Sequence, residues 1–320
     1  MIPMKLTQLT VFVFVFLTIF GANDAQALTI SPVRVEITGN PGQTLRGEME
    51  ILNEQGEAKI FFSSFENFEP SGDTGSPRFV GNTGNLSTWL NTTDRIDIAP
   101  NEKQLIPFTI TIPADAEPGG YFSAIFWGSQ NPETQEAGEV AIGGKLGVLI
   151  LLRVAGDIHE EAGLSEFSTN DNKRLLTAVP VAFGYRFTNK GDDRVVPLGD
   201  IVIKNTFGIE VEKIEANESE GNVLPNSSRK FQVIWEKDAP KDIQGFLANA
   251  KAQLSNFHFG FYRAQAAIVW GSTNKIETAS TWFFLFPWQL LSIVAAGLIV
   301  LYFLLRRYNA WIISRSGARK

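Results

Sequence analysis

The sequence predicts an all-β protein with two tandem β-sandwich domains, followed by one C-terminal transmembrane helix. Short runs of alternating or β-branched residues recur between turns rich in Gly, Pro and Asn, and no amphipathic helix separates them. That pattern favours sandwiches over βαβ units. The helix is predicted because residues 281–305 carry no charge and exceed the roughly 20 residues that cross a bilayer.

The N-terminus has the three parts of a secretory signal peptide, predicted over residues 1–27. Lys5 supplies a positive charge, Val11–Phe20 is an apolar run too short to span, and Ala25 and Ala27 form an A-x-A cleavage pattern. An uncleaved N-terminal anchor is the alternative. Both interpretations place the following residues, up to about 280, outside the cytoplasm.

The first domain is predicted over residues 28–155. Val33–Ile37 and Leu45–Leu52 alternate strictly, as half-buried strands do, and Pro107 predicts an edge or a bulge. Residues 69–89 are rich in Gly, Ser, Pro and Asn, which predicts a long surface loop or a crossing between sheets. Seven strands are expected, at 33–37, 45–52, 58–65, 95–98, 105–112, 121–127 and 144–154.

The second domain is predicted over residues 156–278. Its expected strands are 164–167, 178–189, 199–204, 209–214, 230–235, 245–254 and 264–271. The two domains echo each other weakly, since Phe108 would correspond to Phe231 and Gly120-Tyr121 to Gly260-Phe261. Structural repeats are one interpretation. The other is that turns and alternation are generic in all-β domains.

The C-terminal helix is predicted to be a stop-transfer anchor. Trp282 and Trp288 lie at one end of it, as interface-seeking aromatics do, and Arg306 and Arg307 follow it at once. A basic flank stays on the cytoplasmic side, so the tail 306–320 is predicted to be cytoplasmic and the protein a single-pass type I cell-membrane protein. A buried core helix is the alternative, but such a helix should show a polar face.

Charge and cysteine content narrow the class of protein. The chain has a net charge of −6, and residues 28–280 hold 33 of its 34 acidic residues. An acidic exterior argues against nucleic acid or an anionic lipid surface as the main partner. The chain has no cysteine, so its exported domains must rely on their cores, and thiol chemistry and Cys-zinc sites are excluded. This composition fits a bacterial envelope protein.

No motif in the sequence predicts catalysis, a cofactor or a metal. His159 and His258 fall in different domains without zinc-ligand spacing, and no nucleophile elbow or phosphate loop occurs. The acidic turns Asp171-Asn172 and Asp192-Asp193 favour ordinary turn chemistry over calcium. We therefore expect a non-enzymatic protein, with an envelope hydrolase using an unrecognised carboxylate pair as a further alternative.

Aromatic residues are the remaining candidates for ligand binding, although core packing is their commoner fate. No ligand-binding residue is assigned from the sequence. Four N-x-[ST] sequons, at Asn85, Asn91, Asn217 and Asn226, are interpreted as chance occurrences. The aromatic candidates are Phe65, Phe68, Phe79, Trp89 and Trp127.

Several short motifs together resemble a known family. Ile30-Ser31-Pro32, the Pro41-Gly42 turn, a strand ending at Asn53 and the corner Ile112–Tyr121 resemble the membrane-anchored proteins related to the WxL-interacting family of Gram-positive bacteria. More loosely, the chain resembles the immunoglobulin-like domains of periplasmic pilus chaperones. The first resemblance implies two immunoglobulin-like domains, one binding peptidoglycan and one a surface partner.

These observations lead to one function and one rival. The leading expectation is a membrane-anchored surface protein that binds cell-wall polymer or another envelope protein. The alternative is a chaperone or assembly factor for surface polymers, which acts by adding an edge strand to a client. Neither the ligand nor the oligomeric state follows from the sequence.

Overall fold

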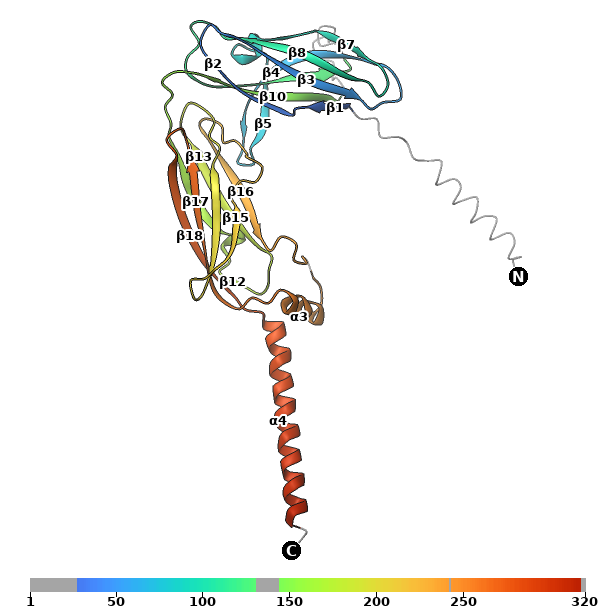
Figure 1. Cartoon of the computed structure of the whole chain (residues 1–320), viewed down its shortest axis with the longest axis vertical. Coiled ribbons are helices and arrows are strands. Elements are labelled where there is room, and N and C mark those ends of the chain that lie inside the picture. Colours follow the sequence, from blue (N-terminus) through green and yellow to red (C-terminus); the bar gives the residue numbers. More distant parts are fainter. Residues whose placement is uncertain (1–27, 131–143, 242, 318–320) are drawn as a thin grey trace, which may run out of the picture. The chain divides into compact units, whose positions relative to one another are not determined.

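The computed structural model describes residues 28–130, 144–241 and 243–317. The predicted signal peptide, with Ala25 and Ala27, lies outside the described residues. The all-β prediction with two tandem immunoglobulin-like sandwiches and one C-terminal apolar helix is confirmed (Figure 1). By their contacts, residues 28–68 and 79–156 form one unit, and residues 69–78 and 157–317 form the other.

The first unit is a sandwich of two sheets. One sheet has the order β1-β3-β8-β6, and the other has the order β2-β10-β9-β4-β5, with β7 also paired to β4. A four-residue helix, α2 (Leu86–Trp89), precedes β6. The strands are β1 (Leu28–Ser31), β2 (Arg34–Gly39), β3 (Thr44–Asn53), β4 (Lys59–Ser71), β5 (Ser76–Gly81), β6 (Leu90–Thr92), β7 (Arg95–Ile98), β8 (Lys103–Thr111), β9 (Gly119–Gly128) and β10 (Lys145–Val154).

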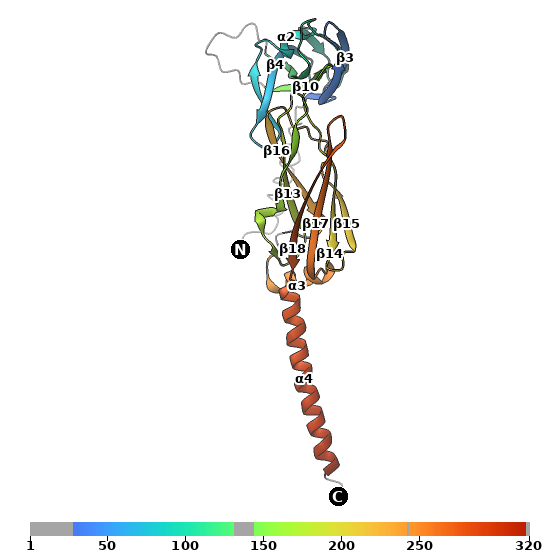
Figure 2. The ribbon, with the colours of Figure 1, turned by 90° about the vertical axis from the view of Figure 1, so that its left-hand side faces the viewer.

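The second unit repeats this plan. Its sheets have the orders β11-β13-β16 and β12-β18-β17-β14-β15, and Figure 2 shows the long strands of both. A 3-10 turn, η2 (Asn170–Asn172), follows β11. The strands are β11 (Ala162–Thr169), β12 (Leu175–Leu176), β13 (Val181–Asn189), β14 (Leu198–Asn205), β15 (Glu210–Glu215), β16 (Ser227–Trp235), β17 (Gly260–Trp270) and β18 (Lys275–Leu285).

The repeat extends to two unusual details. In each unit the first strand switches sheets, so that a short second strand runs parallel to the last strand: β2 with β10, and β12 with β18. Each unit also ends a strand at a fully buried asparagine, Asn53 or Asn189, whose amide donates to the carbonyl four residues later. The side-chain Oδ1 of the same asparagine accepts a hydrogen bond from the backbone N–H two residues later. The two sandwiches therefore share one topology.

Each unit has its own aromatic core. In the first, Trp127 is fully buried and its Nε1 lies 3.4 Å from Met49 Sδ. In the second, Phe183, Trp235 and Phe283 are buried together, and the rings of Trp235 and Phe283 lie 6.1 Å apart. These cores result from the strict alternation of the strands, which turns every second side chain inward.

Three segments differ from the sequence prediction. Residues 69–89, expected to be a surface loop or a crossing between sheets, form the end of β4, then β5 and α2. They are not a loop, but they do lead from one sheet to β6 in the other. Residues 245–254, expected to be a strand, form the helix α3 (Phe246–Ser255), because Ala, Leu, Lys and Gln are strong helix formers. Residues 281–285, expected to start the apolar helix, complete β18, whose whole length pairs with β17.

The apolar helix α4 (Trp288–Gly317) therefore begins seven residues later than predicted. It starts after Pro287, whose carbonyl accepts the hydrogen bond from Leu291 N–H (3.0 Å). Within Trp288–Ile313, an 18-residue window reaches a mean hydropathy of 2.2, and none of that window is buried within the protein. Length and composition are sufficient to cross a bilayer.

Candidate functional site: the open edge of strand β10

Strand β10 is central along one half and an edge strand along the other. Antiparallel β9 pairs with all of it, from Lys145↔Gly128 to Val154↔Gly119. Parallel β2 pairs only from Leu149 onward, and Leu149 N–H donates to the Val33 carbonyl at 3.0 Å. In a strand, alternate residues point their N–H and C=O groups to the same side. Lys145 and Gly147 therefore direct theirs past the end of β2.

Within the described residues, no strand pairs with Lys145–Val148 on that side. The gap follows from the local sequence Ser31-Pro32-Val33, because proline has no N–H and cannot continue a ladder. Before Pro32 the chain pairs with β3 in one sheet, and after it the chain pairs with β10 in the other. Among the described residues, the switch leaves the first four residues of β10 without a hydrogen-bonded strand on that side, although β1 still packs close to β10.

Apolar side chains border this edge on both faces of the strand. Val148 points into the core and is buried, whereas Leu146 is 36 % exposed. On the outer face Gly147 lies under Phe126, and a Cβ at this glycine would stand 2.6 Å from the phenylalanine ring. The missing side chain is what allows the ring to cover the strand.

Phe126 belongs to an aromatic cluster on the outer face of the sheet. The cluster comprises Phe68, Phe79, Phe122 and Phe126. The Phe79 and Phe126 rings meet edge to face at 4.8 Å, and Phe68 contacts both Phe79 (6.1 Å) and Phe122 (5.9 Å). Phe79 is the most accessible of the four, at 39 % exposed. The result is an apolar surface beside unpaired backbone groups.

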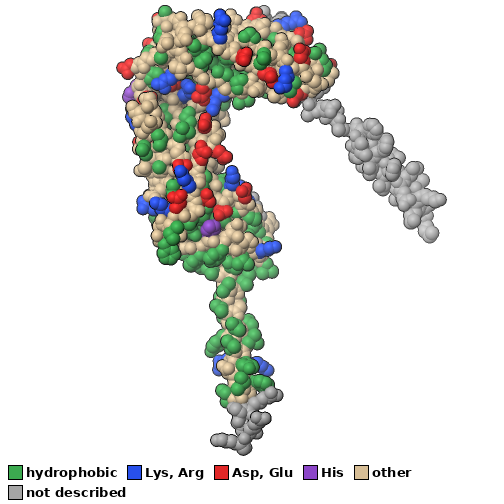
Figure 3. All heavy atoms as spheres, viewed as in Figure 1, with side chains coloured by type: hydrophobic (Ala, Val, Ile, Leu, Met, Phe, Trp, Pro, Cys, Tyr) green, Lys and Arg blue, Asp and Glu red, His purple; other side chains and the backbone are tan. Residues whose placement is uncertain are grey.

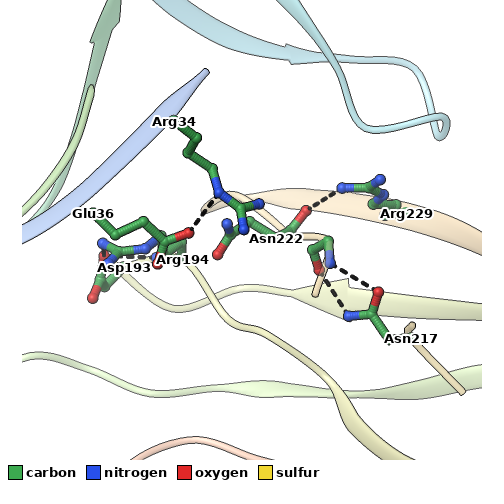
Figure 4. A network of polar contacts seen from close by, with 8 residues as sticks. Arg34, Glu36, Asp193, Arg194, Asn217, Asn222 and Arg229 are labelled. Atoms are coloured by element: carbon green, nitrogen blue, oxygen red, sulfur yellow. Dashed lines mark hydrogen bonds and ion pairs between the residues drawn. The ribbon is translucent and has the colours of Figure 1, made fainter. Parts of the chain in front are cut away.

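Charges near the edge are paired. Lys145 Nζ lies 3.7 Å from Glu66 Oε1 across the sheet. Arg34, at the start of β2, forms an ion pair with Glu36 at 3.1 Å (Figure 4). Because cation and anion alternate, the edge has no strong charge of one sign. It is suited to a partner that contributes backbone hydrogen bonds and apolar side chains.

The aromatic residues predicted from the sequence divide between core and surface. Phe65, Trp89 and Trp127 pack in the first core. Trp89 contacts the ring of Tyr121 at 4.6 Å, and burial raises the pKa of that tyrosine. Phe68 and Phe79 lie instead in the outer cluster. Sequence reasoning missed Phe122 and Phe126, although the alternation in Tyr121–Trp127 places both opposite Trp127.

The predicted histidines and turn acids do not form a site together. His159 lies beside Glu161 (3.4 Å), and His258 packs on Trp235 with ring centroids 4.6 Å apart. Asp193 is buried and accepts a hydrogen bond from Arg194 N–H at 2.7 Å. Asp171 pairs with Lys173 (3.1 Å). Among the described residues, no group of three or more His, Cys, Asp or Glu is arranged to hold a metal.

One sequon has a structural role. Asn217 is buried, and its Nδ2 donates to the carbonyls of Pro197 and Gly221, each at 3.1 Å. Figure 4 shows its side chain bonded to the neighbouring turn. An amide nitrogen held in this way cannot carry a glycan without unfolding the turn.

The residues predicted to flank the membrane anchor lie on two elements. Trp282 is on β18, 47 % exposed, with the Arg174 guanidinium 4.7 Å from its ring. Trp288 is the first residue of α4, and Arg306 and Arg307 lie further along the same helix. Figure 3 shows apolar side chains over most of α4, and blue basic ones near its far end.

No protein-family model matches the chain, and neither does any curated protein. Among solved structures, it is similar to the class 5 fimbriae chaperone CfaA, at 12 % identity and a TM-score of 0.39, over 80 % of this chain and 99 % of the other.

A second similar structure is the CsuC–CsuE chaperone–tip subunit complex of Acinetobacter baumannii, at 10 % identity and a TM-score of 0.36. The match covers 79 % of this chain and 97 % of the other. A third is the CupB2 chaperone of Pseudomonas aeruginosa, at 9 % and 0.35, over 80 % of this chain and 100 % of the other.

These neighbours have the pilus-chaperone fold, the looser of the two resemblances. The resemblance to the WxL-interacting family is not supported. Likenesses of this size carry no conclusion about function, which we derive from the open edge of β10.

Proposed function

We propose that this protein is a non-enzymatic, membrane-anchored envelope protein whose first unit binds an extended segment of another envelope protein. The segment would add as a strand beside Lys145–Val148 and continue the line of β2. The exported N-terminal signal and the type I orientation of α4 are parts of the same proposal. It favours the chaperone or assembly-factor alternative over binding of wall polymer.

The observation that carries the proposal is the interrupted pairing of β10. A sheet edge with unpaired N–H and C=O groups is a template for another strand. Natural sheet edges are commonly blocked by proline, and the edge of β8 in this chain is an example. Strand β6 pairs with β8 as far as Phe108, and the next residue of β8 is Pro107. At Lys145–Gly147 the strand has no proline, so its backbone groups remain able to pair.

Specificity would come from the side chains around the edge. In strand addition, main-chain hydrogen bonds provide affinity and pockets for alternate side chains provide selection. Leu146 on one face and the outer aromatic cluster on the other are apolar, so they favour a client segment with apolar residues. A sugar polymer offers no ladder of amide groups to match the edge.

The proposal is tested by photo-crosslinking in the cells that make the protein. A benzoylphenylalanine replaces Leu146 in the full-length chain, and the adducts are identified by mass spectrometry. A matched probe replaces Thr278, an exposed residue of β18. This strand pairs with its parallel neighbour β12 only at Phe284 and Leu285, so Thr278 also lies on an open stretch of edge.

We expect a protein adduct at Leu146 that maps to one extended segment of the partner, and none at Thr278. Adducts to wall fragments alone would return the function to polymer binding. Protein adducts at Thr278 alone would assign the partner to the second unit and refute the proposal for β10.

A further inference from the structure

The second unit exposes an apolar surface at the end where α4 begins. We call it the collar, and it consists of Leu247, Leu254, Phe257, Phe259, Phe286 and Trp288. All six side chains are between 40 and 73 % exposed. Figure 3 shows apolar side chains gathered at this end of the unit and continuing onto α4. An exposed patch of this kind marks an interaction site.

Helix α3 is fixed at this end by one buried side chain. Gln253 is 2 % exposed, its Nε2 donates to Gln289 Oε1 (2.5 Å) and to the Thr177 carbonyl (3.1 Å), and its Oε1 accepts from Leu290 N–H (3.0 Å). Leu290 N–H is one of the first-turn donors that a helix cannot satisfy internally. Gln253 therefore caps α4 and holds α3 beside it.

With Gln253 and Ala250 buried, the opposite side of α3 faces outward. That side carries Leu247, Lys251 and Leu254, which follow one another at spacings of four and three residues and so share one face. An exposed face of leucines with a lysine is typical of a helix lying in a membrane interface. The lysine can extend its ammonium group to the headgroups while its methylenes cover apolar surface.

The length of α4 sets the level of the bilayer surface. From Trp288 to Leu305 there are 18 residues, and Arg306 and Arg307 follow. At about 1.5 Å per residue these cover roughly 27 Å, close to the hydrocarbon thickness of about 30 Å. If Arg306 and Arg307 lie at one surface, the other surface falls at Trp288, the first residue of α4. That level is the collar.

The charge distribution agrees with this placement. Residues 243–320 contain a single acid, Glu277, although the whole chain has 34. Glu277 lies on β18 opposite Ile268, away from the collar end at Gly260↔Leu285. Glu236 does lie near the collar, with its Oε1 3.5 Å from the Nε2 of His258. The segments that carry the collar residues themselves, 246–260 and 285–288, contain no acid.

We infer that the collar lies in the headgroup layer of the membrane, with α3 flat on the lipid surface, so that the base of the second unit rests on the bilayer. This inference rests on the proposed span of α4 and adds a second, peripheral contact to it. The contact would hold the second unit against the membrane instead of letting it swing on a single helix.

The absence of cysteine allows a direct test with single-cysteine variants of the full-length protein. Leu254→Cys reports on the collar, and Leu298→Cys reports on the middle of α4. Thr273→Cys reports on the turn of the β17–β18 hairpin. Because β17 is 11 residues long, at about 3.4 Å per residue this turn lies about 34 Å from the collar end. Each position is exposed, so the label does not disturb the core.

Each variant carries the fluorophore NBD and is reconstituted into phosphatidylcholine–phosphatidylglycerol vesicles. We expect lipids with a nitroxide on the headgroup to quench the Leu254 label, lipids with a doxyl group deep in the chain to quench the Leu298 label, and neither to quench the Thr273 label. Quenching at Leu298 with none at Leu254 would refute the collar and leave the anchor intact. No quenching at Leu298 would refute the anchor, and the collar with it.

Discussion

The Nε2 of Gln253 donates a 2.5 Å hydrogen bond to the Oε1 of Gln289, joining α3 to the first turn of α4. The same glutamine accepts from Leu290 N–H, so one buried side chain satisfies both a side chain and a helix terminus. The base of the second unit is therefore built around a polar contact within an otherwise apolar surface. Losing it leaves several groups without partners.

We expect Gln253→Ala to lower the free energy of unfolding by about 1–3 kcal/mol, because it leaves the Leu290 N–H and Thr177 carbonyl without this partner. Thermal unfolding of the full chain in mild detergent measures the change, and hydrogen exchange at Leu290 should quicken. Gln244→Ala, at an exposed position, is the matched control. Unchanged exchange at Leu290 would contradict the capping role.

Lys145→Pro should abolish the protein adduct at Leu146 in the crosslinking experiment, because it removes the N–H that points past the end of β2. The β9 ladder should survive, since that N–H does not point toward β9. Lys145→Ala removes the same side chain and its contact with Glu66 but keeps the N–H, so the adduct should persist. Equal adduct yields in the two variants would rule out strand addition here.

Phe79→Ala should weaken partner binding more than folding. Its ring is 39 % exposed and contacts Phe126 and Phe68, pair contacts worth about 0.5–1.5 kcal/mol each. We expect a lower adduct yield at Leu146 with a small loss of thermal stability. Phe207→Ala, at a more exposed position in the second unit, should change neither. An undiminished yield would remove the aromatic cluster from the site.

Trp127→Ala should destabilise the first unit by about 3–5 kcal/mol, the range for truncating a large buried ring. Trp127 is completely buried and also loses its contact with Met49 Sδ. Guanidinium unfolding followed by circular dichroism gives the difference. Trp282→Ala removes a half-exposed tryptophan and should cost far less. Similar losses for both variants would show that burial does not set the cost.

The parts of the fold that the sequence predicts well are those specified by local alternation. The strand expected at Leu45–Leu52 is found at Thr44–Asn53, and that expected at Arg95–Ile98 has those same bounds. Where local preference and context disagree, prediction fails in both directions. The β context predicts a strand at 245–254, but the helix-forming Ala and Gln there form α3. The uncharged Thr281–Leu285 predicts the start of the apolar helix, but it pairs as part of β18.

The site was less predictable than the fold because it depends on register. That Leu149 pairs with Arg34 is decided by contacts between segments far apart in the sequence. Only Pro32 gives a local sign that a ladder stops. The outer position of Phe68 also depends on pairing, since Asn67↔Ser123 places it next to Phe122.

Strand β18 continues into α4 through Phe286 and Pro287, and this continuity has a mechanical consequence. If the protein is pulled away from the membrane while α4 holds, the tension enters the second unit at Leu285. Eleven residue pairs join β18 to β17, and antiparallel hydrogen bonds lie perpendicular to the strands. Force along β18 therefore loads these hydrogen bonds together in shear, so they must break together and not one after another. The same hairpin that completes the sandwich is thus a strong attachment point.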